Sequence, residues 1–381
     1  MKSKITKPVI VLGLVSFFTD FASEMLYPIT PIFLTSFLGA SMSLVGLIEG
    51  LAEITAGFLK GYFGNLSDKI GKRSIFVAAG YSLSGIVKSL PGLIASVPIV
   101  IISRVGDRIG KGIRTAPRDA LLASYANENT GAVFGFHRSM DTFGAVAGPL
   151  TALALLYFIP NQYQTIYLLS LIPSMFAIGF TLAVKDKFIK TKSIRKSYFN
   201  SIKLAPKEFK ILLVLFTLFS FVNSSDVFLI LRSKEISSSD TIAVLGYVFY
   251  NFIYAIASYP IGMLADKVGK KNIFIVGLLI FSIVYFGFAF SNSQLLTWIL
   301  FSFYGIYAAS TEGVTKAWIS DLISDEWRAS AIGLFTSLSS FAIMFGSIFT
   351  GFLWDNFGSQ VPFFISAFVS LVIAIILFFK K

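Results

Sequence analysis

The sequence predicts an all-α integral membrane protein. In this fold, twelve transmembrane helices form two six-helix bundles related by a pseudo-two-fold axis along the membrane normal. The 381 residues are 55% hydrophobic and only 14% charged, whereas soluble proteins carry roughly 25% charged residues. Apolar runs long enough to cross a bilayer recur along the chain, and the two halves of the chain repeat one another. This composition excludes a soluble enzyme, a nucleic-acid-binding module and a disordered chain.

The apolar runs define the expected spans. They lie near residues 9–37, 42–63, 74–93, 96–118, 133–157, 164–184, 211–232, 241–264, 273–290, 294–319, 332–354 and 361–379. A helix needs about 20 apolar residues to cross the hydrocarbon core, so these spans use most of the chain. Three lysines precede the first run, as in a secretory leader, but no cleavage site of small residues follows. We therefore expect the first run to remain as a membrane helix.

Basic residues mark one face of the membrane. Loops on the other face, such as residues 38–41 and 291–293, contain no charge. The basic loops and both termini contain Lys2, Lys4, Lys7, Lys69, Lys72, Arg73, Lys267, Lys270, Lys271, Lys380 and Lys381. Positively charged loops stay in the cytoplasm. The sequence therefore predicts a multi-pass protein of the cytoplasmic (inner) membrane with both termini in the cytoplasm.

The longest connection divides the chain. Residues 185–210 contain eight lysines and Arg195 against Asp186 and Glu208, so this segment supplies +7 of the chain's net charge of +12. We expect a cytoplasmic linker that fixes the topology and contacts anionic membrane lipid, and we expect no nucleic-acid partner. The expected domains are an N-terminal bundle of residues 1–184, this linker, and a C-terminal bundle of residues 211–381.

An internal repeat relates the two halves. The segment Gly64–Arg73, GNLSDKIGKR, recurs 198 residues later as Gly262–Lys271, GMLADKVGKK. At the same offset, Gly135, Phe143 and Gly148 match Gly333, Phe341 and Gly346. Because each repeat contains six spans, both repeats have the same orientation in the membrane and enclose a central site.

The repeated segment resembles the signature loop of the major facilitator superfamily, which lies between spans 2 and 3 and again between spans 8 and 9. The resemblance covers essentially the whole chain and implies a transporter built from two bundles. It also implies that Asp68, Arg73 and Asp266 belong to a cytoplasmic gate. Arg118 and Asp141 lie nearer the cytoplasm when spans 4 and 5 are counted at about 1.5 Å per residue, and we assign them to the same gate.

Two further segments are similar to motifs of this family. Arg104–Gly112, RVGDRIGKG, resembles the span-4 motif but has Asp107, Arg108 and Lys111 where the family usually has small or neutral residues. Gly144–Pro149, GAVAGP, resembles the core of a motif associated with antiporters, although the paired glycines that should follow are absent. Small residues spaced by four also let helices pack closely, so a packing role remains equally open for this segment.

Charged residues within the spans indicate where the function lies. Arg104, Arg108 and Lys111 fall on one stripe of span 4, and exposing all three to lipid would cost about 9 kcal/mol. They must therefore face acids or water. The acids expected at similar depth, which we predict to be the proton-coupling residues, are Asp20, Glu24, Glu53 and Asp107. The alternative is that these charges form ion pairs that only hold the N-terminal bundle together.

The C-terminal bundle supplies the facing wall. Its spans contain polar side chains among tyrosines, in contrast to the charged spans of the N-terminal half. The predicted substrate-binding residues are Arg104, Arg108, Lys111, Asn223, Asp226, Asn251 and Glu312. Hydrogen-bonding groups in a largely apolar pocket are typical of small-molecule sites.

These features predict a secondary active transporter that works by alternating access. The chain has no cysteine and a single histidine, His137, so we expect no disulfide, metal or cofactor. Because no nucleotide-binding motif occurs, the energy should come from an ion gradient, and membrane carboxylates beside cations suit protons. We predict a monomer that carries a small anionic or zwitterionic organic molecule, with efflux by antiport favoured.

Other functions stay open at this level. The same charges would serve proton-coupled uptake of a metabolite or a siderophore-like molecule. A flippase for lipids or other amphiphiles would use the same fold, and a passive channel is a third possibility. The sequence contains no catalytic constellation that would indicate an enzyme.

Overall fold

The computed structural model describes residues 5–27, 29–40, 42–126, 129–159, 162–186, 205–224, 226–238 and 240–379, and within them every regular element is a helix. The N-terminal half contains α1 (Lys7–Leu26), α2 (Ile29–Ile32), η1 (Phe33–Phe37), α3 (Met42–Ile70), α4 (Arg73–Val87), η2 (Leu90–Gly92), α5 (Val97–Tyr125), α6 (Thr130–Phe158), α7 (Tyr163–Leu169) and α8 (Leu171–Thr181). The C-terminal half contains α10 (Lys207–Val222), α11 (Val227–Ser237), α12 (Asp240–Val268), α13 (Lys270–Phe290), α14 (Gln294–Leu322), α15 (Arg328–Phe357) and α16 (Gln360–Phe379). Most of the predicted basic linker, residues 187–204, lies outside the described residues.

The first span of each half is interrupted, whereas the sequence predicted continuous helices over 9–37 and 211–232. Between α1 and α2 the sequence has a proline at position 28, which cannot donate a backbone hydrogen bond. Between α10 and α11 lie Asn223 and Asp226, residue types that disfavour a helix interior because their side chains can compete with the backbone for hydrogen bonds. Position 226 is 198 residues after position 28, so the two interruptions occupy the same place in the repeat.

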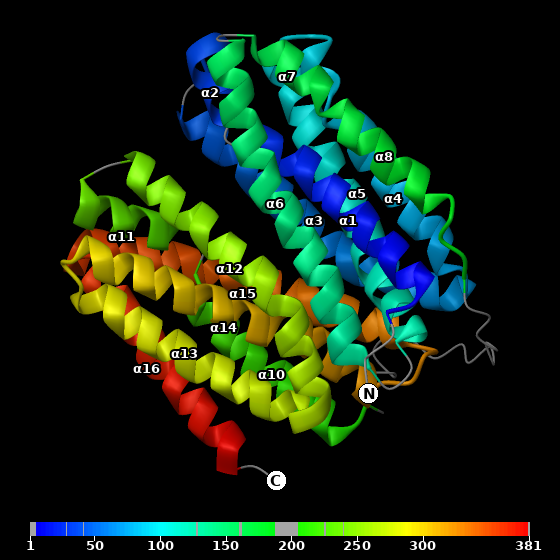
Figure 1. Ribbon diagram of the computed structural model, residues 1–381, viewed down its shortest axis with the longest axis vertical. Coiled ribbons are helices and arrows are strands. Elements are labelled where there is room, and N and C mark those ends of the chain that lie inside the picture. The colour runs from blue at the N-terminus through cyan, green and yellow to red at the C-terminus, as the bar shows by residue number, and fades with distance from the viewer. Residues whose placement is uncertain are drawn as a thin grey trace.

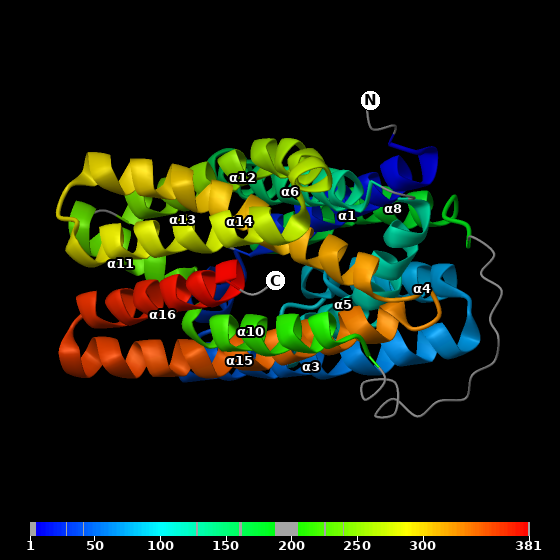
Figure 2. The same ribbon diagram turned by 90° about the horizontal axis from the view of Figure 1, so that it is seen from below.

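Two helix pairs make the main contacts between the halves. Within the N-terminal half, α1 packs on α6 and α8, and α5 packs on α3 and α4. Within the C-terminal half, α14 packs on α12 and α13, and α10 packs on α15. The halves meet where α6 lies against α12 (Figure 1) and α3 lies against α15 (Figure 2). Figure 1 shows α6 and α12 converging toward the end of the molecule where the N-terminus lies.

Repeated glycines lie at these crossings. They are Gly64, Gly135, Gly262 and Gly333. A Cβ atom added to Gly135 on α6 would lie 2.4 Å from the carbonyl oxygen of Ser258 on α12. A Cβ atom added to Gly333 on α15 would lie 2.6 Å from the carbonyl oxygen of Lys60 on α3. The repeat therefore preserves small residues where helices of opposite halves approach most closely.

A methyl group at one crossing tests this packing. We expect Gly135→Ala to lower the apparent melting temperature of the purified protein by several degrees, because overpacking costs roughly 1–3 kcal/mol. Gly179→Ala on α8 is the matched control, since a Cβ atom added there meets nothing within 4 Å. Differential scanning fluorimetry in detergent measures both variants. Equal melting temperatures for the two variants would contradict the close approach of α6 and α12.

Seven of the described helical segments are long and apolar enough to cross a membrane by length and composition alone. They include α1, α6, α12, α13, α15 and α16, together with the continuous stretch formed by α7 and α8. Helix α4 has 15 residues and α10 has 16, which is short for a span. Helix α5 has 29 residues, but seven of them are charged, so its composition alone does not indicate a membrane span. It nevertheless packs against α3 and α4 within the bundle.

Candidate functional site

The cationic stripe of α5 faces an acid from α1. The Lys111 side chain is exposed, and Arg104 and Arg108 are half-buried. All three lie within electrostatic reach of the Glu24 carboxylate. Folding therefore brings together predicted substrate-binding cations and a predicted proton-coupling acid that are far apart in the sequence.

A pair of carboxyl groups lies beside this stripe. The carboxyl groups of Asp20 on α1 and Asp141 on α6 lie close together, and Ser16 donates its hydroxyl to Asp141 Oδ1. Two neighbouring carboxyl groups favour holding a proton between them, because two like charges at short distance repel one another. Asp141, predicted in the cytoplasmic gate, therefore lies with the predicted proton-coupling residue Asp20.

The glycines of the Gly144–Pro149 segment bring these two helices together. A Cβ atom added to Gly144 would lie 2.3 Å from the carbonyl oxygen of Phe17, and one added to Gly148 would lie 2.7 Å from the amide nitrogen of Met25. The segment thus has the close-packing role that small residues allow, and this packing positions Asp141 against α1.

Arg138 connects the carboxyl pair to the other half of the molecule. Its Nη1 atom lies 2.6 Å from Asp141 Oδ2, and its Nη2 atom forms an ion pair with Glu312 on α14. Its Nε atom donates to the hydroxyl of Tyr254 on α12, and the guanidinium lies 5.1 Å from that ring's centroid. The side chain of Glu312 is 48% exposed, so solvent reaches this contact.

A second buried ion pair holds Asp107, a predicted proton carrier. The Nζ atom of Lys88, which follows α4, lies 3.6 Å from Asp107 Oδ1. Lys88 also donates to Ser23 Oγ on α1 at 2.6 Å. Lys88 and Asp107 are 4% and 8% exposed. A lysine from a neighbouring helix therefore compensates the charge of Asp107.

Further contacts join the halves near the end of α5. Arg118 pairs with Asp119 at 2.8 Å, and the other carboxylate oxygen of Asp119 lies 2.7 Å from Lys316 Nζ on α14. A small cavity here is lined by Arg118, Asp119, Phe134, His137, Arg138, Glu312, Gly313 and Lys316. His137 is buried, and its Nε2 atom has no hydrogen-bond partner among the described residues.

The first signature loop clamps a helix of the opposite half. Asp68 Oδ2 accepts hydrogen bonds from the backbone amide and the hydroxyl of Ser330, at 2.7 and 2.9 Å. Ser330 lies in the first turn of α15, where unpaired amides favour an anion. Asp68 Oδ1 accepts from Arg73 at 3.0 Å, and Arg73 also donates to the carbonyl oxygen of Asp325.

The second signature loop repeats the arrangement. Asp266 accepts hydrogen bonds from the amides of Gly131 and Ala132 in the first turn of α6, at 2.8 and 2.7 Å. Lys270 lies 2.9 Å from Asp266 and 2.7 Å from Asp321. Because Asp266 and Ser330 are the repeat equivalents of Asp68 and Ala132, the two clamps are related by the pseudo-two-fold axis. The halves are closed on the side of the signature loops.

Comparisons with known proteins identify the family. The sequence model of the Major Facilitator Superfamily matches residues 12–237 and 211–381. An uncharacterized MFS-type transporter of Methanocaldococcus jannaschii is 36% identical, over 99% of this chain and 95% of the relative. The chain belongs to the major facilitator superfamily. The resemblance carried by the signature loops is thereby confirmed, and the protein is a multi-pass membrane transport protein.

Solved structures of this family confirm the predicted twelve-helix, two-bundle fold. The human organic anion transporter MFSD10 superimposes with a TM-score of 0.77 and 15% identity, covering 97% of this chain and 98% of that one. The proton:xylose symporter XylE superimposes with a TM-score of 0.77 and 18% identity, covering 97% of this chain and 94% of that one. At these identities the likeness concerns the fold alone.

In this superfamily member, three predicted substrate-binding residues of the C-terminal half make contacts within that half. Asp226 accepts hydrogen bonds from the hydroxyls of Tyr304 at 2.7 Å and Tyr250 at 3.2 Å. Asn251 is buried, and its amide donates to the carbonyl oxygen of Tyr247 on its own helix. Asn223 ends α10 at the interruption. The side chain of Glu53 lies outside the described residues.

Sequence reasoning passed over three charged residues of the site. Arg138, Lys88 and Asp119 all lie in or beside predicted spans, and an ionisable residue within a span is itself a signal of function. None of the three belongs to a motif that resembles those of the family. Their partners lie 19 or more residues away in most cases, so helix periodicity could not pair them.

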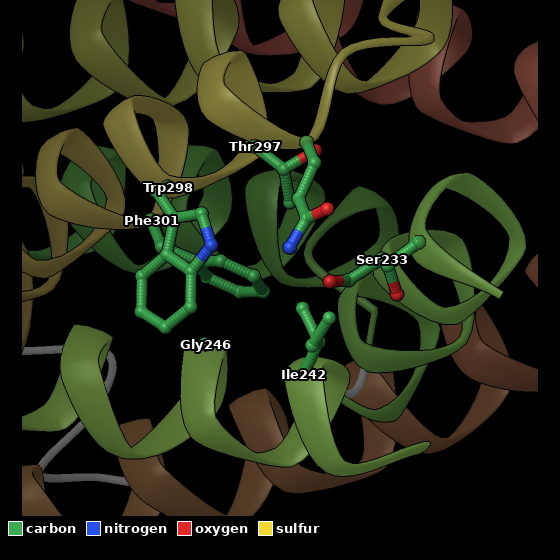
Figure 3. A pocket seen from close by; sticks show the side chains of 8 residues that line it. Ser233, Ile242, Gly246, Thr297, Trp298 and Phe301 are labelled. Atoms are coloured by element: carbon green, nitrogen blue, oxygen red, sulfur yellow. The ribbon is translucent and has the colours of Figure 1, made fainter. Parts of the chain in front are cut away.

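A separate small pocket occurs at the end of the C-terminal bundle that lies away from the signature loops. Figure 3 shows its lining from α11, α12 and α14, with Trp298, Thr297 and Phe301 around the space. Ser233 and Ile242 contribute from the other two helices. None of its lining residues is charged, so it lacks the groups that would hold an ionic substrate. The charged site described above is therefore the candidate.

Proposed function

We propose that the chain is a secondary active transporter that carries a small anionic or zwitterionic organic molecule and couples this movement to protons. The observation that carries the proposal is the gathering of Arg104, Arg108 and Lys111 around Glu24, beside the Asp20–Asp141 pair. Guanidinium and ammonium groups bind carboxylate and phosphate through charge-assisted hydrogen bonds. The same cations lie within electrostatic reach of the Glu24 carboxylate.

Coupling follows from competition for these cations. A protonated carboxyl group attracts a neighbouring cation less than a carboxylate does, so proton uptake at Glu24 or at the Asp20–Asp141 pair frees cations for the substrate. Loss of the proton restores the internal pairing and releases the substrate. The two halves rock around this site, with Asp68, Arg73, Arg118 and Asp266 closing one side.

Two proteins that share this fold are named for related activities. One is named an organic anion transporter and another a proton:xylose symporter. The partial antiporter motif at Gly144–Pro149 favours efflux, even though its glycines also pack α6 on α1. We further propose a monomer in the cytoplasmic membrane with both termini in the cytoplasm, and the domain boundaries 1–184, 185–210 and 211–381.

Two alternatives to this proposal are transport in the opposite direction and transport of a different class of substrate. Proton-coupled uptake of a metabolite or siderophore-like molecule would use the same charged groups. A lipid or amphiphile flippase would use the same fold, and it is favoured only by the apolar outer face of α8, where Ile172, Met175 and Phe176 are exposed.

Reconstituted protein tests the proposal. Proteoliposomes loaded with the pH indicator pyranine are exposed to a panel of dicarboxylates, sugar phosphates and zwitterionic amino acids. We expect at least one compound to change the internal pH. Arg108→Gln should slow that change roughly tenfold or more, because a charge-assisted contact contributes about 1.5–3 kcal/mol. Lys207→Gln, which neutralises an exposed lysine at the start of α10, is the control and should retain the native rate.

Two outcomes would contradict the proposal. One is uptake of a radiolabelled compound that continues unchanged after a protonophore collapses the gradient, which would remove the proton coupling. The other is redistribution of fluorescent phospholipid between leaflets with no response to any compound of the panel, which would favour the flippase.

A further inference from the structure

Arg138 is the only arginine of the described residues shown to bond acidic side chains of both halves at once. It lies on α6, one turn before Asp141. Each of its three guanidinium nitrogens has a different partner: Asp141, Glu312 and Tyr254. The planar guanidinium fixes the directions of its donors, so it cannot move toward one partner without weakening its bonds to the others.

The two acidic partners of Arg138 differ in one respect. Asp141 lies beside a second carboxyl group, Asp20, and repulsion between two neighbouring carboxylates favours a proton on the pair. Glu312 lies on α14 in the other half, and no carboxyl group of the described residues forms a hydrogen bond with it. The charge of the pair therefore changes with its proton content, from about −2 without a proton to about 0 with two, while Arg138 keeps its charge.

Other charged or titratable groups surround this cluster. They are Asp20 and Glu24 on α1; Lys88 after α4; Lys111, Arg118 and Asp119 on α5; His137 on α6; Asp226 before α11; Tyr254 on α12; and Glu312 and Lys316 on α14. Lys316 and Arg118 are both bound to Asp119. Arg138 is the cation that directly bonds both Asp141 and Glu312.

We propose that Arg138 is a positioning residue that transmits the protonation of the Asp20–Asp141 pair to the contact between the two halves. When the pair gains a proton, Asp141 holds Arg138 less strongly and Glu312 becomes its main anionic partner. The Arg138–Glu312 contact then tightens and keeps the signature-loop side closed. When the pair loses its proton, Arg138 is drawn into the N-terminal half and that side opens more readily. This inference rests on one part of the proposed function, namely that the Asp20–Asp141 pair binds and releases a proton.

A cysteine reporter measures this closure without a substrate. The chain has no native cysteine, so Ser258→Cys introduces the sole thiol. Ser258 is 1% exposed at the crossing of α12 with α6, and its hydroxyl bonds only within its own helix. Labelling by N-ethylmaleimide in detergent reports opening on the signature-loop side. Because the maleimide reacts with the thiolate, each rate is normalised to the unfolded variant at the same pH.

We expect the normalised labelling of Ser258→Cys to be several-fold faster at alkaline than at mildly acidic pH. In Arg138→Gln and in Glu312→Gln this ratio should fall to about one, because the link between the halves is missing. Asp141→Asn should remove the ratio as well. Arg138→Lys keeps the positive charge and should retain part of the ratio. This variant also replaces Arg138→Gln in the test if Arg138→Gln fails to fold. Lys207→Gln should leave the ratio unchanged.

A merely structural role for Arg138 would change labelling equally at both pH values. The inference is overturned if the ratio persists in Arg138→Gln, in Glu312→Gln or in Asp141→Asn, or if the reporter protein shows no ratio at all. Ser174→Cys, buried within the N-terminal half on α8, should stay unlabelled at both pH values. Because no gradient or substrate is present, the result is separable from failure of the transport assay.

Discussion

Asp68→Ala should open the signature-loop side of the transporter and raise the labelling of Ser258→Cys by at least tenfold. Asp68 accepts three hydrogen bonds, two from Ser330 in the opposite half and one from Arg73. Its removal leaves the guanidinium of Arg73, which is 3% exposed, without its carboxylate. A hydrogen bond to a charged group contributes about 1.5–3 kcal/mol, and about 1.4 kcal/mol corresponds to a tenfold change in population. The two bonds to Ser330 join the halves, so their loss weakens the closed state, whereas the bond to Arg73 lies within the N-terminal half.

The control for this variant is Asp186→Ala. Asp186 also caps a helix, since it accepts hydrogen bonds from the amides of Arg73 and Ser74 at the start of α4. Both partners lie in the same half as Asp186. Asp186→Ala should therefore lower thermal stability without exposing Ser258→Cys. If Asp68→Ala and Asp186→Ala label equally, the clamp between Asp68 and α15 does not control closure.

Lys88→Met should destabilise the N-terminal bundle by roughly 3–5 kcal/mol, because it leaves the buried carboxylate of Asp107 without its lysine. Methionine keeps most of the volume of the side chain, so the effect reports charge rather than packing. Arg104, Arg108 and Arg114 also attract the Asp107 carboxylate. The expected loss of stability therefore lies near the lower end of this range. Thermal unfolding in detergent measures the loss.

The double variant Lys88→Met/Asp107→Asn should recover much of this stability, since neither member of the pair then carries an unpaired charge. A double variant no more stable than Lys88→Met would contradict the importance of the pair. The same protein also tests the predicted proton-coupling role of Asp107. If proton-coupled transport is retained, the pair has a structural role in the bundle. If coupling is lost, Asp107 takes part in proton transfer.

The sequence alone carried the main features of the fold. Apolar runs, the basic loops and the repeat offset of 198 residues predicted two equivalent bundles, because each of these features can be recognised from the order of residues alone. The interruption after α1 was less visible, since the apolar character continues across it. Only the backbone shows that helix hydrogen bonding stops there and at Asn223.

The site was predictable in its residue types but not in its pairings. Intramembrane charges at Arg104, Arg108 and Glu24 could be predicted as a group, because the cost of burying charge applies to any residue in a span. The assignment of Asp141 to the gate came from counting residues along one helix. Counting gives depth along α6 but not which neighbour the side chain meets, and the structure places it against Asp20.

The membrane architecture, the repeat and the set of charges that must avoid lipid can be predicted from the sequence. The pairing of those charges depends on the tertiary structure, which brings Lys88 to Asp107, Asp20 to Asp141, and Arg138 to Glu312 across the two halves. Hydrophobicity and helical period are properties of a single segment. An ion pair between helices depends instead on the rotation, depth and packing of two segments, which the glycine crossings fix only when the bundles assemble.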